Sequence, residues 1–148
     1  MKRGEAAPAV SIATAGALEE VKALLARCGL PTADIHDGIL FVVARSGSEL
    51  CGSAGAELFG RMALLRSVAV HPQWRGKGIG RSLCGDLIAR LRAAGVQRAF
   101  LLTTDAQRFF ATLRFSVLQR GSLPMEILGT AQFRELCPQT AVAMMRDL

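Results

Sequence analysis

Residues 64–80 read LLRSVAVHPQWRGKGIG, and this stretch decides the fold. Its apolar first half is typical of a buried strand, and a short loop leads into a glycine-rich turn that opens a helix. Arg75, Gly78 and Gly80 have the spacing R-x-x-G-x-G. Glycine lets the backbone close around an anion, and the start of a helix offers unpaired N–H groups at its positive end. The stretch therefore predicts a phosphate-binding turn and a phosphorylated ligand.

Two common phosphate motifs do not fit this turn. A Rossmann fingerprint would need a small residue where Arg81 stands, and a P-loop would need G-x-x-x-x-G-K-[ST], which is absent. The segment resembles the acyl-CoA-binding motif of the GNAT N-acetyltransferases, R/Q-x-x-G-x-G/A after a strand ending in V-A-V-x-P. The alternative is a glycine-rich helix start that binds no ligand.

The pattern of elements predicts one α/β domain over residues 1–148. We expect strands over 9–13, 39–44, 50–59 and 64–70, a strand at 100–102, another from Phe115 and a last one over 141–145. We expect helices from a cap at Thr14 to Gly29, from Gly78 to about Gly95, over 106–113 and over 124–136. The resemblance implies the same fold: a central mixed, mostly antiparallel sheet of six to seven strands flanked by helices.

Composition narrows the class of protein. The chain has 148 residues, a net charge of +6 and 51% hydrophobic residues, but no apolar run near the roughly 20 residues of a membrane span. Its cations are dispersed and aromatics make up only 5%, so we expect no nucleic-acid partner. The four cysteines form no C-x-x-C pair, which argues against a metal site or a disulfide framework. We expect a cytoplasmic protein with reduced, mostly buried thiols.

The resemblance extends beyond the turn. Residues 103–115, TTDAQRFFATLRF, lie where the family commonly reads N-x-x-A-x-x-F-Y-x-x-x-G-F. The residues LLRS at 64–67, the pair Phe109-Phe110 and the tail FRELCPQTA at 133–141 are similar to arsenic-resistance and amino-acid N-acetyltransferases. Arg114 stands where that family often has glycine, and the sequence offers no functional reason for it.

The resemblance implies acetyl-CoA as cosubstrate and no metal. The turn would hold the pyrophosphate, and the end of the preceding strand would pair with the pantetheine arm. The expected cofactor-binding residues are Val68, Ala69, Val70, Arg75, Gly76, Lys77, Gly78, Ile79, Gly80, Arg81, Thr103, Phe109 and Phe110.

The catalytic groups are less evident. The resemblance implies a backbone N–H near Val70 as the donor to the thioester oxygen. Many relatives protonate the leaving thiolate with a tyrosine where Phe110 stands, and this chain contains no tyrosine. Phe110 then packs on the pantetheine or serves as a core aromatic. Glu57 is the candidate general base or ammonium partner, with a surface glutamate at a hairpin end as the alternative. His71 is a rival base, with a solvated loop histidine as the alternative.

A charged side chain in the strand indicates where the substrate could bind. Strand alternation puts Arg66 on one face with Val68 and Val70, and a buried guanidinium needs an anion. Its fork suits a substrate carboxylate, and the resembling amino-acid acetyltransferases commonly carry arginine in this strand. The alternative is an internal ion pair, for example with Glu57. Thr140 is a further candidate for the same carboxylate.

These observations favour an acetyl-CoA-dependent N-acetyltransferase for a small amino acid or glutamate-like analogue, which the resemblance extends to arsenic-containing ones such as arsinothricin. The enzymatic alternatives are a peptide N-terminus or a polyamine as acceptor. A polyamine site would need several carboxylates, and the chain has 12 against 18 cations. The missing tyrosine motivates a third alternative, a CoA-binding sensor without turnover. Dimers are common among the resembling enzymes, so a homodimer is also open.

Overall fold

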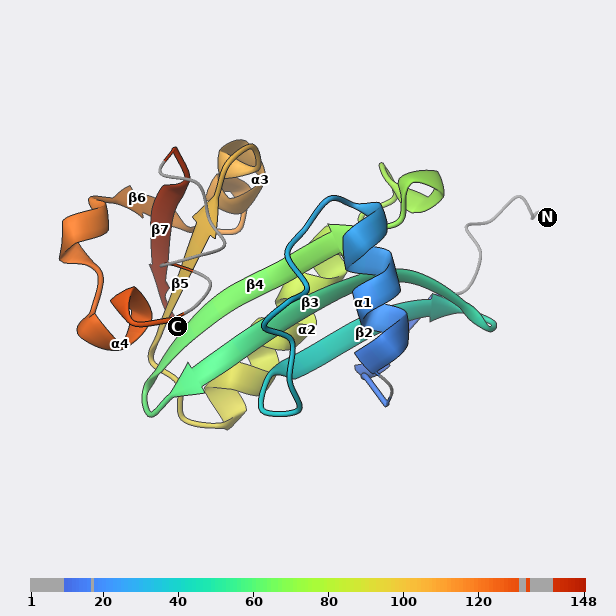
Figure 1. The fold of residues 1–148 in the computed structure, drawn as a ribbon, viewed down its shortest axis with the longest axis horizontal. Helices are drawn as coiled ribbons and strands as arrows, with labels where there is room; N and C mark the ends of the chain where they lie inside the picture. Colours follow the sequence, from blue (N-terminus) through green and yellow to red (C-terminus); the bar gives the residue numbers. More distant parts are fainter. Residues whose placement is uncertain (1–9, 17, 131–132, 134–139) are drawn as a thin grey trace.

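The computed structural model describes residues 10–16, 18–130, 133 and 140–148 (Figure 1). Seven strands form one sheet in the order β1-β2-β3-β4-β5-β7-β6. Neighbouring strands are antiparallel except β4 and β5, which are parallel, so the predicted mixed, mostly antiparallel sheet is confirmed. The strands are β1 (Ser11–Thr14), β2 (Leu40–Ser46), β3 (Glu49–Phe59), β4 (Met62–Val70), β5 (Arg98–Thr103), β6 (Ser116–Leu118) and β7 (Val142–Asp147).

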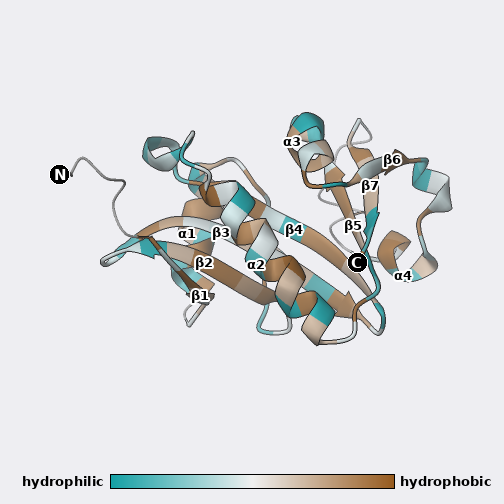
Figure 2. Ribbon diagram, turned by 180° about the vertical axis from the view of Figure 1, so that it is seen from behind, coloured by the Kyte–Doolittle hydropathy of each residue, from teal (hydrophilic) through white to brown (hydrophobic). Residues whose placement is uncertain are grey.

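Helices cover both faces of this sheet (Figures 1 and 2). Helix α1 (Leu18–Arg27) buries Val21 and Leu25 against β2 on one face. Helix α2 (Ile79–Ala93) packs on the other face through its buried leucines. Because successive residues of a strand point to opposite faces, β2 supplies Phe41 to the first face and Val42 to the second. The shorter helices are η1 (Pro72–Trp74), α3 (Gln107–Thr112), η2 (Arg120–Ser122) and α4 (Met125–Leu128).

A β-bulge interrupts β4. Ser53 pairs with Ala69 and Gly55 with Arg66, so Ser67 and Val68 together oppose the single residue between Ser53 and Gly55. Ser67 has a φ of 57°, and its carbonyl accepts a hydrogen bond of 2.9 Å from the buried Ser53 hydroxyl. An extra residue shifts the alternation of side chains by one. The expectation that Arg66 shares a face with Val68 and Val70 is therefore wrong. Arg66 is directed to the α1 face, whereas Val68 and Val70 pack against the α2 cluster.

The bulge lies where β4 and β5 separate. The two strands pair from Met62–Arg98 to Leu65–Leu101, and the pairing stops just before the bulge. In Figure 1 the two strands meet at one end of the sheet and diverge towards the other. Beyond this point no described strand pairs with β4 on its β5 side, and both cavities described below begin there.

Two other expectations need correction. Thr14 does not cap a helix, because it is the last residue of β1 and pairs with Val42. The helix expected over 124–136 is confirmed only in part, because α4 ends at Leu128 with Gly129 as its C-cap, Phe133 is again helical, and residues 131–132 and 134–139 lie outside the described part. None of the helices in the described ranges is long and apolar enough to cross a membrane.

Candidate functional site

Two adjoining cavities occupy the region where β4 and β5 diverge. The first, here the turn cavity, has a volume of about 600 Å³ and lies between the glycine turn, the end of β4 and α3. The second, here the strand groove, has a volume of about 500 Å³ and lies between β4 and β5. Together they are large enough for a long ligand that enters over α2 and ends between the two strands.

The glycine turn has the geometry of an anion site. Gly76 and Gly78 adopt φ angles of 77° and 80°, a left-handed conformation that side chains disfavour. Gly78 is the N-cap of α2 and has no side chain to occupy the first N–H groups of the helix. Those N–H groups carry the positive end of the helix dipole, and the exposed cations Arg75, Lys77 and Arg81 flank them. The turn is therefore open, positively charged and shaped for phosphate.

The space beside the turn is narrow, and Gly80 leaves it open because glycine has no side chain. A Cβ atom built on Gly80 would lie 3.4 Å from Phe109 Cζ and 3.6 Å from Val70 Cγ2. A larger side chain at this position would therefore occupy the turn cavity, which Gly80, Val70 and Phe109 all line.

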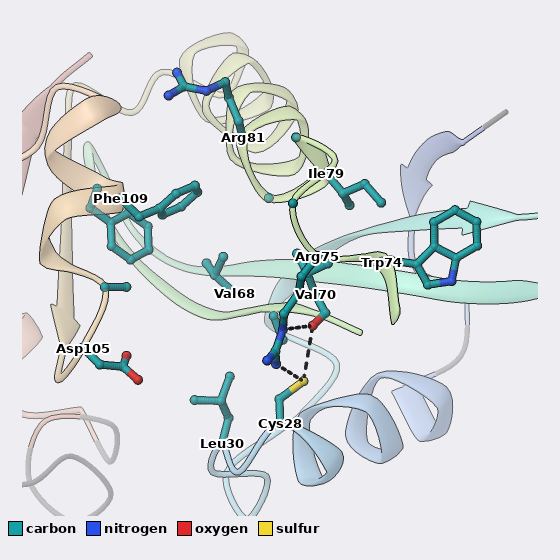
Figure 3. Close-up of a pocket in the computed structure, with 16 residues that line it drawn as sticks. Cys28, Leu30, Val68, Val70, Trp74, Arg75, Ile79, Arg81, Asp105 and Phe109 are labelled. Atoms are coloured by element: carbon teal, nitrogen blue, oxygen red, sulfur yellow. Dashed lines mark hydrogen bonds between the residues drawn. The ribbon is translucent and has the colours of Figure 1, made fainter. Parts of the chain in front are cut away.

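Arg75 connects the turn to the end of β4. Its Nε donates to the Val70 carbonyl at 3.0 Å, and its Nη2 donates to Cys28 Sγ at 3.8 Å (Figure 3). Cys28 Sγ in turn donates to the same Val70 carbonyl at 3.7 Å. The Val70 carbonyl therefore has two donors, Arg75 and Cys28. These contacts hold the Arg75 guanidinium beside the cavity, and its exposed side chain remains accessible to an anion.

The N–H group of Val70 points away from β3. His71 N donates to Cys51 O at 2.7 Å, so residues 51 and 71 form a hydrogen-bonded pair, and the adjacent pair Gly52–Val70 does not. The polar backbone groups of such a residue are directed to the opposite side of the strand. For Val70, that side is the one from which β5 has diverged.

Aromatic side chains form the wall opposite the turn. Phe110 is 6% exposed and makes edge contacts with Phe109 and Phe115, at ring-centre distances of 5.0 and 5.9 Å. It lines both cavities, so the two alternatives for Phe110, a ligand contact and a core aromatic, are compatible. Thr103 Oγ1 accepts a hydrogen bond of 3.0 Å from Ala106 N, which fixes the turn before α3.

Arg66 is the most buried charged residue in the described ranges, with a side chain that is 0% exposed. It donates to both carboxylate oxygens of Asp34, to Glu57 Oε2 at 3.0 Å and to Ser67 Oγ at 3.1 Å. Of the two alternatives for Arg66, the structure shows the internal ion pair, with Asp34 as a partner that the sequence did not suggest. Contact with a substrate carboxylate stays a prediction.

The ion pair between Asp34 and Arg66 shifts the pKa of both side chains. Burial alone would raise the pKa of Asp34, but hydrogen bonds from Arg66 and its positive charge hold that pKa below the usual value. Burial alone would lower the pKa of Arg66, but hydrogen bonds to Asp34 and Glu57 raise it. The pair is therefore fully ionised near neutral pH.

The remaining candidates lie farther from the cavities. Glu57 on β3 and His71 are absent from the described residues that line either cavity. His71 Nδ1 accepts a hydrogen bond from Gln73 N at 3.1 Å and caps η1. Thr140 is exposed and adjoins Ala141, which lines the strand groove.

Sequence reasoning missed Asp105 and Cys28, which both line the turn cavity. Among the described residues, Cys51 and Cys84 are buried free thiols and Cys28 is half-buried, and Cys137 lies outside them.

Comparisons with known proteins identify relatives of this chain. The acetyltransferase (GNAT) family matches residues 15–115. The chain is 35% identical over 95 residues to an acetyltransferase of Sodalis glossinidius, covering 57% of this chain and 67% of that protein. It is 34% identical over 65 residues to an amino-acid acetyltransferase of Aeromonas salmonicida, covering 44% of this chain but only 15% of that protein.

A solved structure shows the same fold. N-acetylglutamate synthase from Neisseria gonorrhoeae, complexed with coenzyme A and N-acetyl-glutamate, aligns with a TM-score of 0.78 at 22% identity. The alignment covers 95% of this chain and 35% of the synthase.

Proposed function

Because the chain belongs to the GNAT acetyltransferase family, we propose that it transfers the acetyl group of acetyl-CoA to the amine of a free α-amino acid. The observation that carries this proposal is the open, positively charged N-terminus of α2, continuous with a cavity that reaches the gap between β4 and β5. Glycine N–H groups, Arg75, Lys77 and Arg81 would bind the pyrophosphate, and the pantetheine would extend along Val68–Val70.

The reaction balances without a tyrosine. The neutral amine nitrogen forms a bond to the acetyl carbonyl carbon, and the carbon–sulfur bond breaks to release CoA thiolate. The ammonium loses one proton to water before attack. As the new bond forms, the nitrogen loses a second proton to water and becomes the neutral amide nitrogen, while the thiolate takes a proton from water. The Val70 N–H is the donor that we propose for the carbonyl oxygen, because it is directed to the side where β5 has diverged.

The proton acceptor is a separate proposal. Glu57 is retained as the predicted base, although one of its oxygens accepts from Arg66 and its side chain is only 17% exposed. Thr140 is retained as the predicted partner of the substrate carboxylate. A test of both uses Glu57→Gln and Thr140→Val, with the rate against pH and the KM for the acceptor as readouts.

The acceptor class is supported by two relatives. The Aeromonas relative is an amino-acid acetyltransferase, and the Neisseria synthase structure holds N-acetyl-glutamate. A glutamate-like acceptor, including an arsenic-containing one, is the finer proposal.

The test measures CoA release with free amino acids, phosphinothricin, arsinothricin, a peptide with a free N-terminus and spermidine. Turnover with α-amino acids or their analogues supports the proposal. Turnover only with the peptide or spermidine overturns the acceptor class, and binding of acetyl-CoA with no release favours a sensor.

A further inference from the structure

The turn cavity and the strand groove meet at Asp105. Both cavities are lined by Leu30, Val68, Asp105, Ala106 and Phe110, and only Asp105 in this group is charged. On the proposed function, on which this inference rests, the thioester would end at this junction and the acceptor would approach it. We propose that the Asp105 carboxylate binds the ammonium group of the acceptor.

Charge is the first reason. Asp105 is the only acidic residue among the described residues that line either cavity. A carboxylate in a cavity built for a polyanionic cofactor repels that cofactor, and the repulsion falls with distance. In Figure 3 Asp105 lies well away from Arg81, and its carboxylate points into the space bordered by Leu30 and Val68. Its position therefore suits a cation at the reacting end of the cavity rather than the phosphates.

A structural role does not account for Asp105. The residue is exposed and forms no ion pair within the described ranges. Thr103 Oγ1, not Asp105, accepts the hydrogen bond from Ala106 N that closes the turn before α3. No side chain caps the first N–H groups of α3 itself. Replacing Asp105 should therefore leave the fold unchanged.

The chemistry sets which kinetic constant responds. A carboxylate attracts the ammonium form but also stabilises it, which opposes loss of the proton before attack. Asp105 thus acts mainly in binding, and its removal should raise the KM for the acceptor more than it lowers kcat. A single carboxylate also favours acceptors with one ammonium group over polyamines.

The experiment measures amino-acid binding to the complex with CoA, which carries no acetyl group and cannot turn over. Calorimetry is run with a panel of free L-amino acids, and then with the 2-hydroxy acid that corresponds to the amino acid bound most tightly. The variants are Asp105→Asn, Asp105→Glu and the matched control Asp37→Asn, which removes the same charge from an exposed residue outside both cavities. The KM and kcat of each variant are measured alongside.

We expect Asp105→Asn to weaken amino-acid binding by about ten- to a hundredfold, the range for a lost charge-assisted hydrogen bond. Asp105→Glu should retain part of the affinity, and Asp37→Asn should match the wild type. The 2-hydroxy acid should bind the wild type and Asp105→Asn equally. Unchanged amino-acid binding by Asp105→Asn overturns the inference, as does a wild-type complex that binds no amino acid. Binding that depends on Asp105 without any acetyl transfer would overturn only the proposed function.

Discussion

Asp34 and Arg66 are 32 residues apart in the sequence, and two hydrogen bonds join them. The contact between Arg66 Nη2 and Asp34 Oδ1 is 2.6 Å. Asp34 belongs to the segment between α1 and β2, and Arg66 lies beside the β4 bulge. The pair therefore fastens the segment that carries Leu30 to the strand that forms the other side of the strand groove.

Removing this pair should cost stability in a pH-dependent way. Asp34→Asn leaves the buried guanidinium paired with Glu57 alone, so the cost should lie below the about 3–5 kcal/mol of a buried charge that loses every partner. The pKa of Asp34 is lowered in the folded chain, so its contribution is present above the unfolded pKa of about 4 and is lost as the pH falls through the folded value. Urea unfolding at pH 7 and pH 3 should show a large difference from wild type that shrinks at acid pH. Equal midpoints at pH 7 would contradict this prediction, and Asp37→Asn is the control.

A side chain at Gly80 should block the cofactor. Valine there would extend towards Phe109 and Val70, and overpacking typically costs about 1–3 kcal/mol. We expect Gly80→Val to weaken CoA binding by about tenfold or more. Gly85→Val is the matched control, because Gly85 is exposed on the same helix and a Cβ atom built on it would meet no described residue outside its own helix within 4 Å. Fluorescence or calorimetric titration with CoA measures both, and equal affinities would rule out the turn as the binding site.

The folded chain should be less stable with Arg114 than with glycine at this position. It has a φ of 70° after α3, and its N–H donates to Ala111 O while Phe115 N donates to Phe110 O. This is the helix end in which glycine is favoured, because the left-handed conformation costs other residues about 1 kcal/mol. Its charge also acts, after burial and Arg92, to lower the pKa of Arg146. Arg114→Gly should raise the melting temperature, and a lower one would show that the side chain makes a compensating contact.

The three described cysteines should react with a thiol reagent at different rates. Burial raises the pKa of Cys84 to about 12 and also raises that of Cys51, and a protonated, buried thiol reacts slowly. Cys28 is half-buried and lines the turn cavity. Alkylation with iodoacetamide at pH 8, followed peptide by peptide, should label Cys28 first, and CoA should protect it. Labelling of Cys28 that is indifferent to CoA would place the cofactor elsewhere.

The glycine turn and the helix after it were predictable because their signals are local. Arg75, Gly78 and Gly80 are close in sequence, and the helical spacing of Leu83, Leu87 and Leu91 identifies the buried face. The same local pattern located β4 but could not show its bulge. Serine is not a residue that signals a positive φ, so alternation through Ser67 gave the wrong face for Arg66.

The rest of the site depends on contacts between distant segments. Nothing near Arg66 in the sequence indicates Asp34, because a loop residue meets it only after the sheet has formed. Asp105 carries only a weak signal in the sequence. It is a carboxylate in the turn directly after a buried strand, and that strand end borders a cavity only because β4 and β5 diverge.

The most direct test of the proposed function identifies the acetylated product. The chain is incubated with deuterium-labelled acetyl-CoA and a mixture of the common free amino acids, and the products are separated and fragmented by mass spectrometry. We expect one or a few amino acids to carry the labelled acetyl group on the α-nitrogen, and Gly80→Val to form much less of this product at a limiting concentration of acetyl-CoA. Bound acetyl-CoA with no labelled amino acid would contradict the proposed function.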